Sequence, residues 1–285
     1  MYQQGVLAEG VIENFGAWSL REDGLLQITG SGRMPDWESD SDAVCLTTPW
    51  RDVLDRIKAV TISDGITTIG NSAFRDCSRL MYVDIPKSVT EIGQSAFAEC
   101  ESLRYDPIPD TVKAIGIFAF RSCKSLTEVH IPQGVTEIRL HTFEGCDSLQ
   151  RVELPKSIVS IEDGAFWGCA SLTELNIPPD TAEIGVFAFF RCSKLKEVHI
   201  PTGLTVISDA SFSFCKELTE IIIPDGVTRV GDFAFNGCSK LKTIHISESV
   251  TEIGMFAFRG CEGLKGLVIP KSVRKIGIDT LLGNR

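Results

Sequence analysis

Residues 80–102 read LMYVDIPKSVTEIGQSAFAECES, and this stretch decides the fold because the chain repeats it. From Cys77 to Cys261, nine cysteines follow one another at intervals of 23 residues without a slip. A fixed period of this size indicates one short supersecondary unit stacked many times, because a unit that cannot bury its own apolar side can bury it against a neighbour. The sequence therefore predicts a solenoid.

Other units follow the same template, LxxVxIPxxVTxIGxxAFxxCxx, whose positions we number 1–23. Ten units result, the last of them truncated at Arg285. They begin at Ile57, Leu80, Leu103, Leu126, Leu149, Leu172, Leu195, Leu218, Leu241 and Leu264. The predicted organisation is thus a capping segment over residues 1–56 and a leucine-rich repeat array over residues 57–285.

Positions 4 and 6 alternate apolar residues, as in Val83 and Ile85, which is the period of a half-buried strand. Proline at position 7 cannot donate to a strand ladder, so each strand should end there. We expect these strands to form one long parallel sheet. On the other side of the unit, positions 10 and 13 are apolar, and glycine at position 14 suits a tight corner. Too few residues follow for an α-helix, so we expect a 3-10 or single helical turn at the AF dipeptide, with the phenylalanines stacked as an aromatic spine.

The repeated cysteines lie among apolar residues, not in turns, which favours buried thiols acting as small hydrophobes. Neighbouring coils lie about 4.8 Å apart, but parallel Cβ vectors would keep the Cβ atoms too far apart for a disulfide, which we treat as the alternative. Zinc needs ligands that converge on one point, and a single file does not converge. We therefore predict no metal site and no cofactor.

The two ends of the array differ. Trp18, Leu20, Leu26 and Ile28 alternate around Asp23-Gly24, which predicts a hairpin, and residues 48–54 predict one or two turns of helix capped by Thr48. We expect the tryptophans of this segment to cover the first coil; they are Trp18, Trp37 and Trp50. At the other end, template positions for Ala, Phe and Cys hold Thr280, Leu281 and Asn284. Such an uncapped coil suggests a longer natural chain or homo-association.

The charge balance limits the partners. Lys and Arg number 28 against 38 Asp and Glu, a formal net charge of −10, and the basic residues form no run. Nucleic acid and anionic membranes require clustered cations, so neither is an expected partner. The N-terminal MYQQGVLAEGVIENFG lacks the basic leader and apolar stretch of a signal peptide, and no later stretch has the roughly 20 apolar residues of a membrane span.

The unit LxxVxIPxxVTxIGxxAFxxC closely resembles the BspA-like, treponemal-class leucine-rich repeat over residues 57–285. The segment AWSLREDGLLQITGSGRMPDW resembles the N-terminal part that often precedes such arrays. The resemblance implies a right-handed β/α solenoid, no catalytic residues, and a cell-surface or secreted protein that adheres to host or bacterial proteins. A cytoplasmic location is left open by the sequence.

Outward strand residues at positions 3 and 5 are the candidate binding site, because successive side chains of a strand point to opposite faces. We predict that they line a concave face that holds a partner protein or a glycan; the alternative is a solvated face selected for solubility. The candidates are Tyr82, Asp84, Tyr105, Glu128, His130, Arg151, Glu153, Glu174, Asn176, Glu197, His199, Glu220 and His245. Ile222 and Thr243 share the column.

Three other groups of residues are considered as metal, calcium or reactive-thiol sites. Three histidines at position 5 lie two or three coils apart, or about 10 and 14 Å, too far for one metal ion. The acidic loop from Asp36 to Asp42 lacks the glycine and distal glutamate of a calcium loop. Cys45 is off register, and a buried residue is the simpler interpretation than a reactive thiol.

Four phenylalanines at position 16 either form an apolar stripe on the surface or fold over the corner and complete the core; they are Phe118, Phe187, Phe233 and Phe256.

The sequence shows no enzyme motif, because no nucleophile with a base, and no phosphate-binding glycine loop, can be assembled at these spacings. The predicted function is a non-enzymatic protein-binding scaffold in adhesion, with a structural spacer or recruitment domain of a larger protein as the alternative.

Overall fold

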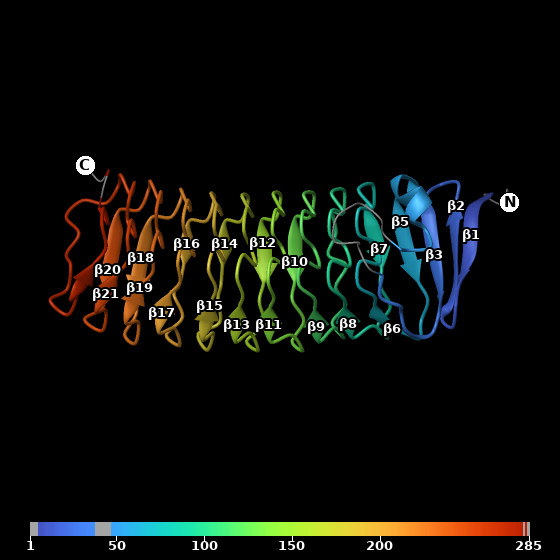
Figure 1. Ribbon diagram of the computed structural model, residues 1–285, viewed down its shortest axis with the longest axis horizontal. Helices are drawn as coiled ribbons and strands as arrows, with labels where there is room; N and C mark the ends of the chain where they lie inside the picture. Colours follow the sequence, from blue (N-terminus) through green and yellow to red (C-terminus); the bar gives the residue numbers. More distant parts are fainter. Residues whose placement is uncertain (1–4, 38–46, 282, 284–285) are drawn as a thin grey trace.

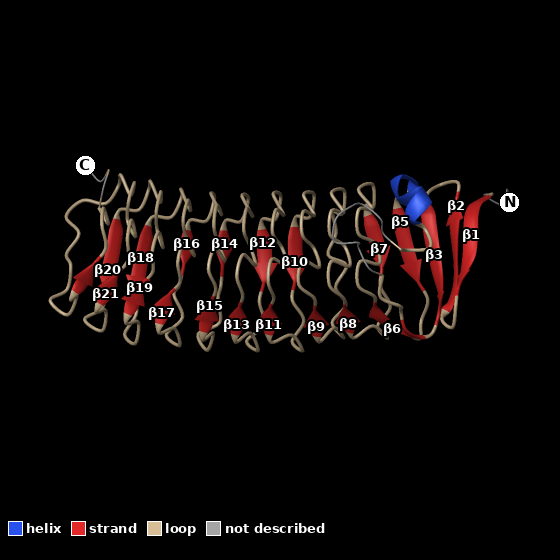
Figure 2. Cartoon of the chain, in the orientation of Figure 1, coloured by secondary structure: helices blue, strands red, loops and turns tan. Residues whose placement is uncertain are grey.

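The computed structural model describes residues 5–37, 47–281 and 283, and the acidic residues Glu38, Asp40 and Asp42, together with Cys45, lie outside them. The chain is an elongated parallel β-solenoid whose coils follow one another in a nearly straight row from the N-terminal to the C-terminal end (Figure 1). Most coils add short strands to two separate ladders, and turns join them (Figure 2). The predicted stack of 23-residue units is confirmed, since strands pair with residues 23 positions away.

The first ladder carries positions 3–6 of the unit. Its strands are β5 (Ala59–Ile62), β7 (Tyr82–Asp84), β10 (Glu128–His130), β12 (Arg151–Glu153), β14 (Glu174–Leu175), β16 (Glu197–Val198), β18 (Glu220–Ile223) and β20 (Thr243–Ile246). Within it, β5 pairs with β7, β10 with β12, β14 with β16, and β18 with β20, all parallel. The ladder is therefore parallel as predicted, but the prediction of one long sheet is wrong.

The first interruption has a chemical cause in the coil that begins at Leu103. Asp106 and Pro107 occupy positions 4 and 5, where other coils carry an apolar residue and a residue with an N–H group. Pro107 has no N–H group to donate to a ladder. The Asp106 carboxylate accepts the backbone N–H of His130 at 2.7 Å and that of Ile108 at 3.0 Å, so a side-chain oxygen takes the place of a backbone carbonyl. Burial raises the pKa of Asp106, and the two N–H donors oppose this shift.

A second parallel ladder, which we did not predict, runs along positions 12 and 13. Its strands are β4 (Gly32–Arg33), β6 (Ile66–Ile69), β8 (Glu91–Ile92), β9 (Ala114–Ile115), β11 (Glu137–Ile138), β13 (Ser160–Ile161), β15 (Glu183–Ile184), β17 (Val206–Ile207), β19 (Arg229–Val230), β21 (Glu252–Ile253) and β22 (Lys275–Ile276). The pairing repeats every 23 residues, as in Ile138 with Ile161 and Ile161 with Ile184. This ladder buries the second apolar file that the sequence indicates.

The third side consists of turns that are hydrogen-bonded to the next coil. The N–H groups of Ser95, Phe97 and Glu99 donate to carbonyls of the following coil at 2.8–2.9 Å, whereas the residues between them donate three residues back within their own coil. This alternation requires left-handed backbone at positions 16 and 20, for example φ 53° at Ser95 and 62° at Glu99. The expected helical turn at the AF dipeptide is absent from the described coils because every second N–H group serves the neighbouring coil.

The interior contains an aromatic file and a thiol file, both as predicted. Successive position-18 rings from Phe74 to Phe258 stack with centroids 5.3–5.7 Å apart and 4–17° between their planes. Eight thiols, from Cys100 to Cys261, donate to the phenylalanine carbonyl 26 residues earlier, at 3.1–3.3 Å. The nine described cysteines are free and buried.

Glycine at position 14, which we predicted to suit a tight corner, allows close packing of neighbouring coils. A Cβ atom added at Gly116 would lie closer than 3.0 Å to backbone atoms of Gln94 and Gly93 in the preceding coil. Gly93, Gly185 and Gly254 show the same crowding against the backbone of the coil before them. These glycines therefore set how closely the coils approach at this corner.

The N-terminal residues cover the first coil. Strands β1 (Val6–Ile12), β2 (Gly16–Arg21) and β3 (Leu25–Gly30) form antiparallel hairpins, the second around Asp23-Gly24 as predicted, and β3 then pairs in parallel with β5. The Trp50 ring extends the phenylalanine spine, stacking on Phe74 at 5.7 Å, and Trp18 and Trp37 pack edge-on against it. The prediction that these tryptophans cover the array is confirmed.

The predicted helix near Thr48 differs in type and extent. It is the 3-10 helix η1 (Arg51–Arg56), and its N-cap residue is Trp50, with no side-chain capping hydrogen bond. Thr48 contributes its backbone carbonyl, which accepts the Arg51 N–H at 3.1 Å. The helix begins directly after Pro49 and the fully buried Trp50 and is six residues long.

Candidate functional site

The strand face, which we define as the side chains of positions 3 and 5 between Tyr82 and His245 without the buried Pro107, is exposed to solvent. In β7, β10 and β12 a buried residue at position 4 lies between exposed residues at positions 3 and 5. The exposed residues are Tyr82, Asp84, Tyr105, Glu128, His130, Arg151, Glu153, Glu174, Asn176, Glu197, His199, Glu220, Ile222, Thr243 and His245. The sequence therefore located this surface correctly, whereas its role stays a prediction.

The strand face is strongly acidic. It holds six carboxylates, on Asp84, Glu128, Glu153, Glu174, Glu197 and Glu220, against the single guanidinium of Arg151. The last three glutamates occupy the same position in consecutive coils, and Glu174 lies directly opposite Glu197 in the paired strands β14 and β16. Among the described residues, no ion pair or side-chain hydrogen bond involves any of these three glutamates. Like charges placed directly opposite are destabilising, so this file costs folding free energy.

In the N-terminal half of the strand face one carboxylate, that of Glu153, has charged partners. A hollow of about 230 Å³ lies beside Asp106, His130 and Glu153. The Glu153 carboxylate contacts His130 Nδ1 at 3.0 Å and the Arg151 guanidinium at 2.5 Å. These contacts leave less unbalanced charge here than along the glutamate file.

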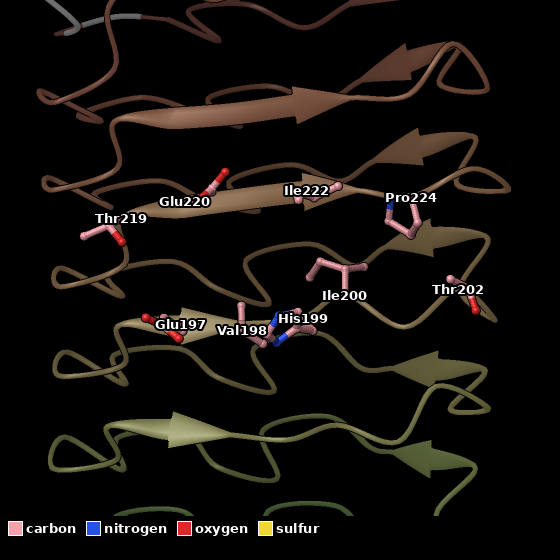
Figure 3. A pocket seen from close by; sticks show the side chains of 9 residues that line it. All are labelled: Glu197, Val198, His199, Ile200, Thr202, Thr219, Glu220, Ile222 and Pro224. Atoms are coloured by element: carbon pink, nitrogen blue, oxygen red, sulfur yellow. The ribbon is translucent and has the colours of Figure 1, made fainter.

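The C-terminal half of the strand face contains a larger pocket of about 470 Å³ between β16 and β18 (Figure 3). It is lined by Glu197, Val198, His199, Ile200, Thr202, Thr219, Glu220, Ile222 and Pro224. Apolar and carboxylate groups therefore share one concavity. Of these residues, our candidates included Glu197, His199 and Glu220, and Ile222 was placed in the same column. The others were missed because the pocket forms where the coils separate, which the repeat pattern does not encode.

The histidines of the strand face lie apart from each other. His130 belongs to β10 and His245 to β20, and His199 lines the larger pocket. Within the described residues, no group of three or more His, Cys, Asp or Glu is placed to hold a metal ion. Asp36, the described member of the acidic loop, accepts the Asn71 N–H at 2.8 Å.

The turn side carries an outer aromatic stripe at position 16. Phe187 and Phe233 are 36% and 37% exposed, and Phe118 and Phe256 are half-buried. All four have positive φ, between 55° and 57°, a strained conformation for a bulky residue. Phe233 stacks on Phe256 at 4.9 Å. The structure thus favours the outward stripe over the interpretation that these rings complete the core.

Comparisons with known proteins agree with this architecture. A profile of the BspA type leucine-rich repeat region matches residues 54–173 and 159–284. A crystal structure described as a leucine-rich cell surface protein from Faecalibacterium prausnitzii is 29% identical, with a TM-score of 0.61, over 97% of this chain and 86% of that chain. A leucine-rich repeat protein from Bacteroides ovatus is 25% identical, with a TM-score of 0.62, over 96% of this chain and 92% of that chain. A search of curated proteins finds no significant match.

A third solved structure, the leucine-rich repeat protein of T. pallidum, is 24% identical, with a TM-score of 0.51, over 90% of this chain and 91% of that chain. At this identity the likeness concerns the fold alone. Among the described residues, none of the helices has the length and hydrophobicity required to cross a membrane.

Proposed function

Because the chain belongs to the BspA-type leucine-rich repeat family, we propose that it is a non-enzymatic scaffold that binds a partner protein on its strand face in cell-surface adhesion. The similar protein from Faecalibacterium prausnitzii is described as a cell surface protein, which supports this location. The strand face extends over many coils, so it offers one continuous surface to a large partner (Figure 1).

The observation that carries the proposal is the unpaired file of Glu174, Glu197 and Glu220. Glu174 and Glu197 lie directly opposite each other, and Glu220 holds the same position on the next coil, so their repulsion weakens the fold and a basic partner surface would offset it. Tyr82 and Tyr105, which are 47% and 65% exposed, add large side chains of the kind enriched in protein interfaces. The partner should therefore be a protein with a basic, partly apolar surface.

A charge reversal tests the proposal. The wild-type chain and the triple variant Glu174→Lys, Glu197→Lys, Glu220→Lys would be compared by surface plasmon resonance on a panel of purified extracellular-matrix proteins and glycans. We expect wild type to bind at least one matrix protein, and the triple variant to bind it about a hundredfold more weakly, because like charges now face each other. Since all three side chains are exposed, the melting temperature should change by no more than about 2 °C.

The control changes the net charge equally on other surfaces. Glu137, Glu183 and Glu262 are exposed and lie outside the strand face, so the variant with all three changed to lysine should keep wild-type affinity. Full affinity in the strand-face variant, or an equal loss in both variants, would refute the proposal. So would a panel on which the wild type binds only glycans or nothing.

A further inference from the structure

The larger pocket forms where two coils separate. β16 ends at Val198, and no backbone hydrogen bond among the described residues joins residues 197–204 to residues 220–227. On its other side, β18 pairs with β20 along four consecutive residues, from Glu220 with Thr243 to Ile223 with Ile246. The first ladder is thus open on one side of β18 and closed on the other, and the opening faces the solvent.

The pocket is amphipathic along its length. Glu197 and Glu220, on neighbouring coils, lie toward one end, whereas Ile200, Ile222 and Pro224 lie toward the other (Figure 3). Ile222 is the only aliphatic residue of the strand face, and 57% of its surface is exposed. An exposed aliphatic side chain beside two unpaired carboxylates calls for a ligand with an apolar stem and a cationic end.

We propose that this pocket binds an arginine side chain presented by an extended segment of the partner protein. The methylene stem packs on Ile222 and Pro224, and the guanidinium donates hydrogen bonds to the carboxylates of Glu197 and Glu220. Arginine fits better than lysine because its planar fork can serve two carboxylates at once. The pocket volume of about 470 Å³ exceeds what one such side chain fills, leaving space for flanking backbone. This inference rests on the proposed function and names the chemistry recognised at one part of the strand face.

A defined peptide tests the pocket without the natural partner. The probe is an acetylated and amidated nonapeptide of threonine, valine and glycine with one central arginine, and its match carries citrulline, which has the same shape but no charge. Binding is measured by isothermal titration calorimetry with the full chain. We expect the arginine peptide to bind, and citrulline to weaken binding about tenfold through loss of the charge-assisted hydrogen bonds.

Two double variants locate the binding. Glu197→Gln with Glu220→Gln removes the pocket charges and should also weaken the arginine peptide about tenfold. Glu137→Gln with Glu262→Gln removes two exposed carboxylates outside the strand face and should keep affinity within about twofold. Ile222→Ser should weaken both peptides, because it removes the stem contact. Circular dichroism melts check that each variant is folded.

The outcomes separate this inference from the proposed function. The proposal that the pocket binds arginine would be overturned by equal affinity for the two peptides, by equal losses of affinity in the two double variants, or by no heat of binding at millimolar arginine peptide. If the Glu197→Gln, Glu220→Gln variant keeps full affinity for a matrix protein that the triple lysine variant no longer binds, the proposed function is supported and the arginine pocket is refuted. If the triple lysine variant also binds that protein fully, both proposals are refuted.

Discussion

Replacing Phe143 with alanine is expected to lower the free energy of unfolding by about 3–5 kcal/mol. The ring is fully buried in the middle of the array and stacks on Phe120 at 5.6 Å and on Phe166 at 5.5 Å. Its removal leaves a cavity between coils that are joined by backbone hydrogen bonds, from the Phe120 N–H to the Thr142 carbonyl and from the Phe143 N–H to the Ala165 carbonyl, both 2.9 Å long, so neither neighbour can move in to fill it. Chemical denaturation followed by circular dichroism measures the loss.

The matched control is another phenylalanine of the same array, on the outside. Phe233 is 37% exposed and stacks on one ring only among the described residues, that of Phe256. Phe233→Ala should therefore cost only about 1 kcal/mol. A cost for Phe143→Ala no larger than that for Phe233→Ala would show that the inner file does not hold the coils together.

Substituting Gly116 with valine is expected to cost about 3 kcal/mol or more. The new Cβ atom would lie closer than 3.0 Å to three backbone atoms of the preceding coil, and backbone cannot move aside as a flexible side chain can. The two coils must then separate, which weakens the hydrogen bond from the Gly116 N–H to the Ile92 carbonyl, 2.8 Å long. Thermal melting and denaturant unfolding both report the change.

Position 14 of the following coil supplies the control. Arg139 already carries a side chain there and is exposed, so Arg139→Ala should change the free energy of unfolding by less than about 0.5 kcal/mol. If Gly116→Val were as mild as Arg139→Ala, close approach of the coils would not be the reason for glycine at this position.

The internal repeat made the architecture predictable because each position has one environment in every coil. The apolar and cysteine positions predicted the buried files, and the alternation at positions 3–6 predicted which side chains face solvent. The second ladder escaped prediction because its strands are two residues long in most coils, too short to show a period. The left-handed turns escaped because Ser95, Phe118 and Ala210 are not residues that usually mark positive φ.

The site was predictable as a surface but not as a pocket. Departures from the template do carry a signal: Asp106-Pro107 marks the interruption of the first ladder, and Ile222 marks the apolar part of the larger pocket. What separates β16 from β18 is the path of the backbone after Val198, where β16 ends. The spacing of residues in the sequence does not show where two neighbouring coils move apart.

The central claim is that the coils stack in register with the cysteines as an interior file, and thiol alkylation mapped by mass spectrometry tests it most directly. Burial raises the pKa of these thiols, to about 12 for Cys261, and the thiolate is the reactive form. The account predicts that iodoacetamide at pH 8 leaves all nine cysteines from Cys77 to Cys261 unmodified in the native protein, whereas all ten cysteines of the chain react in guanidinium. Alkylation of an inner thiol such as Cys169 in the native protein, at the rate seen in guanidinium, would contradict it.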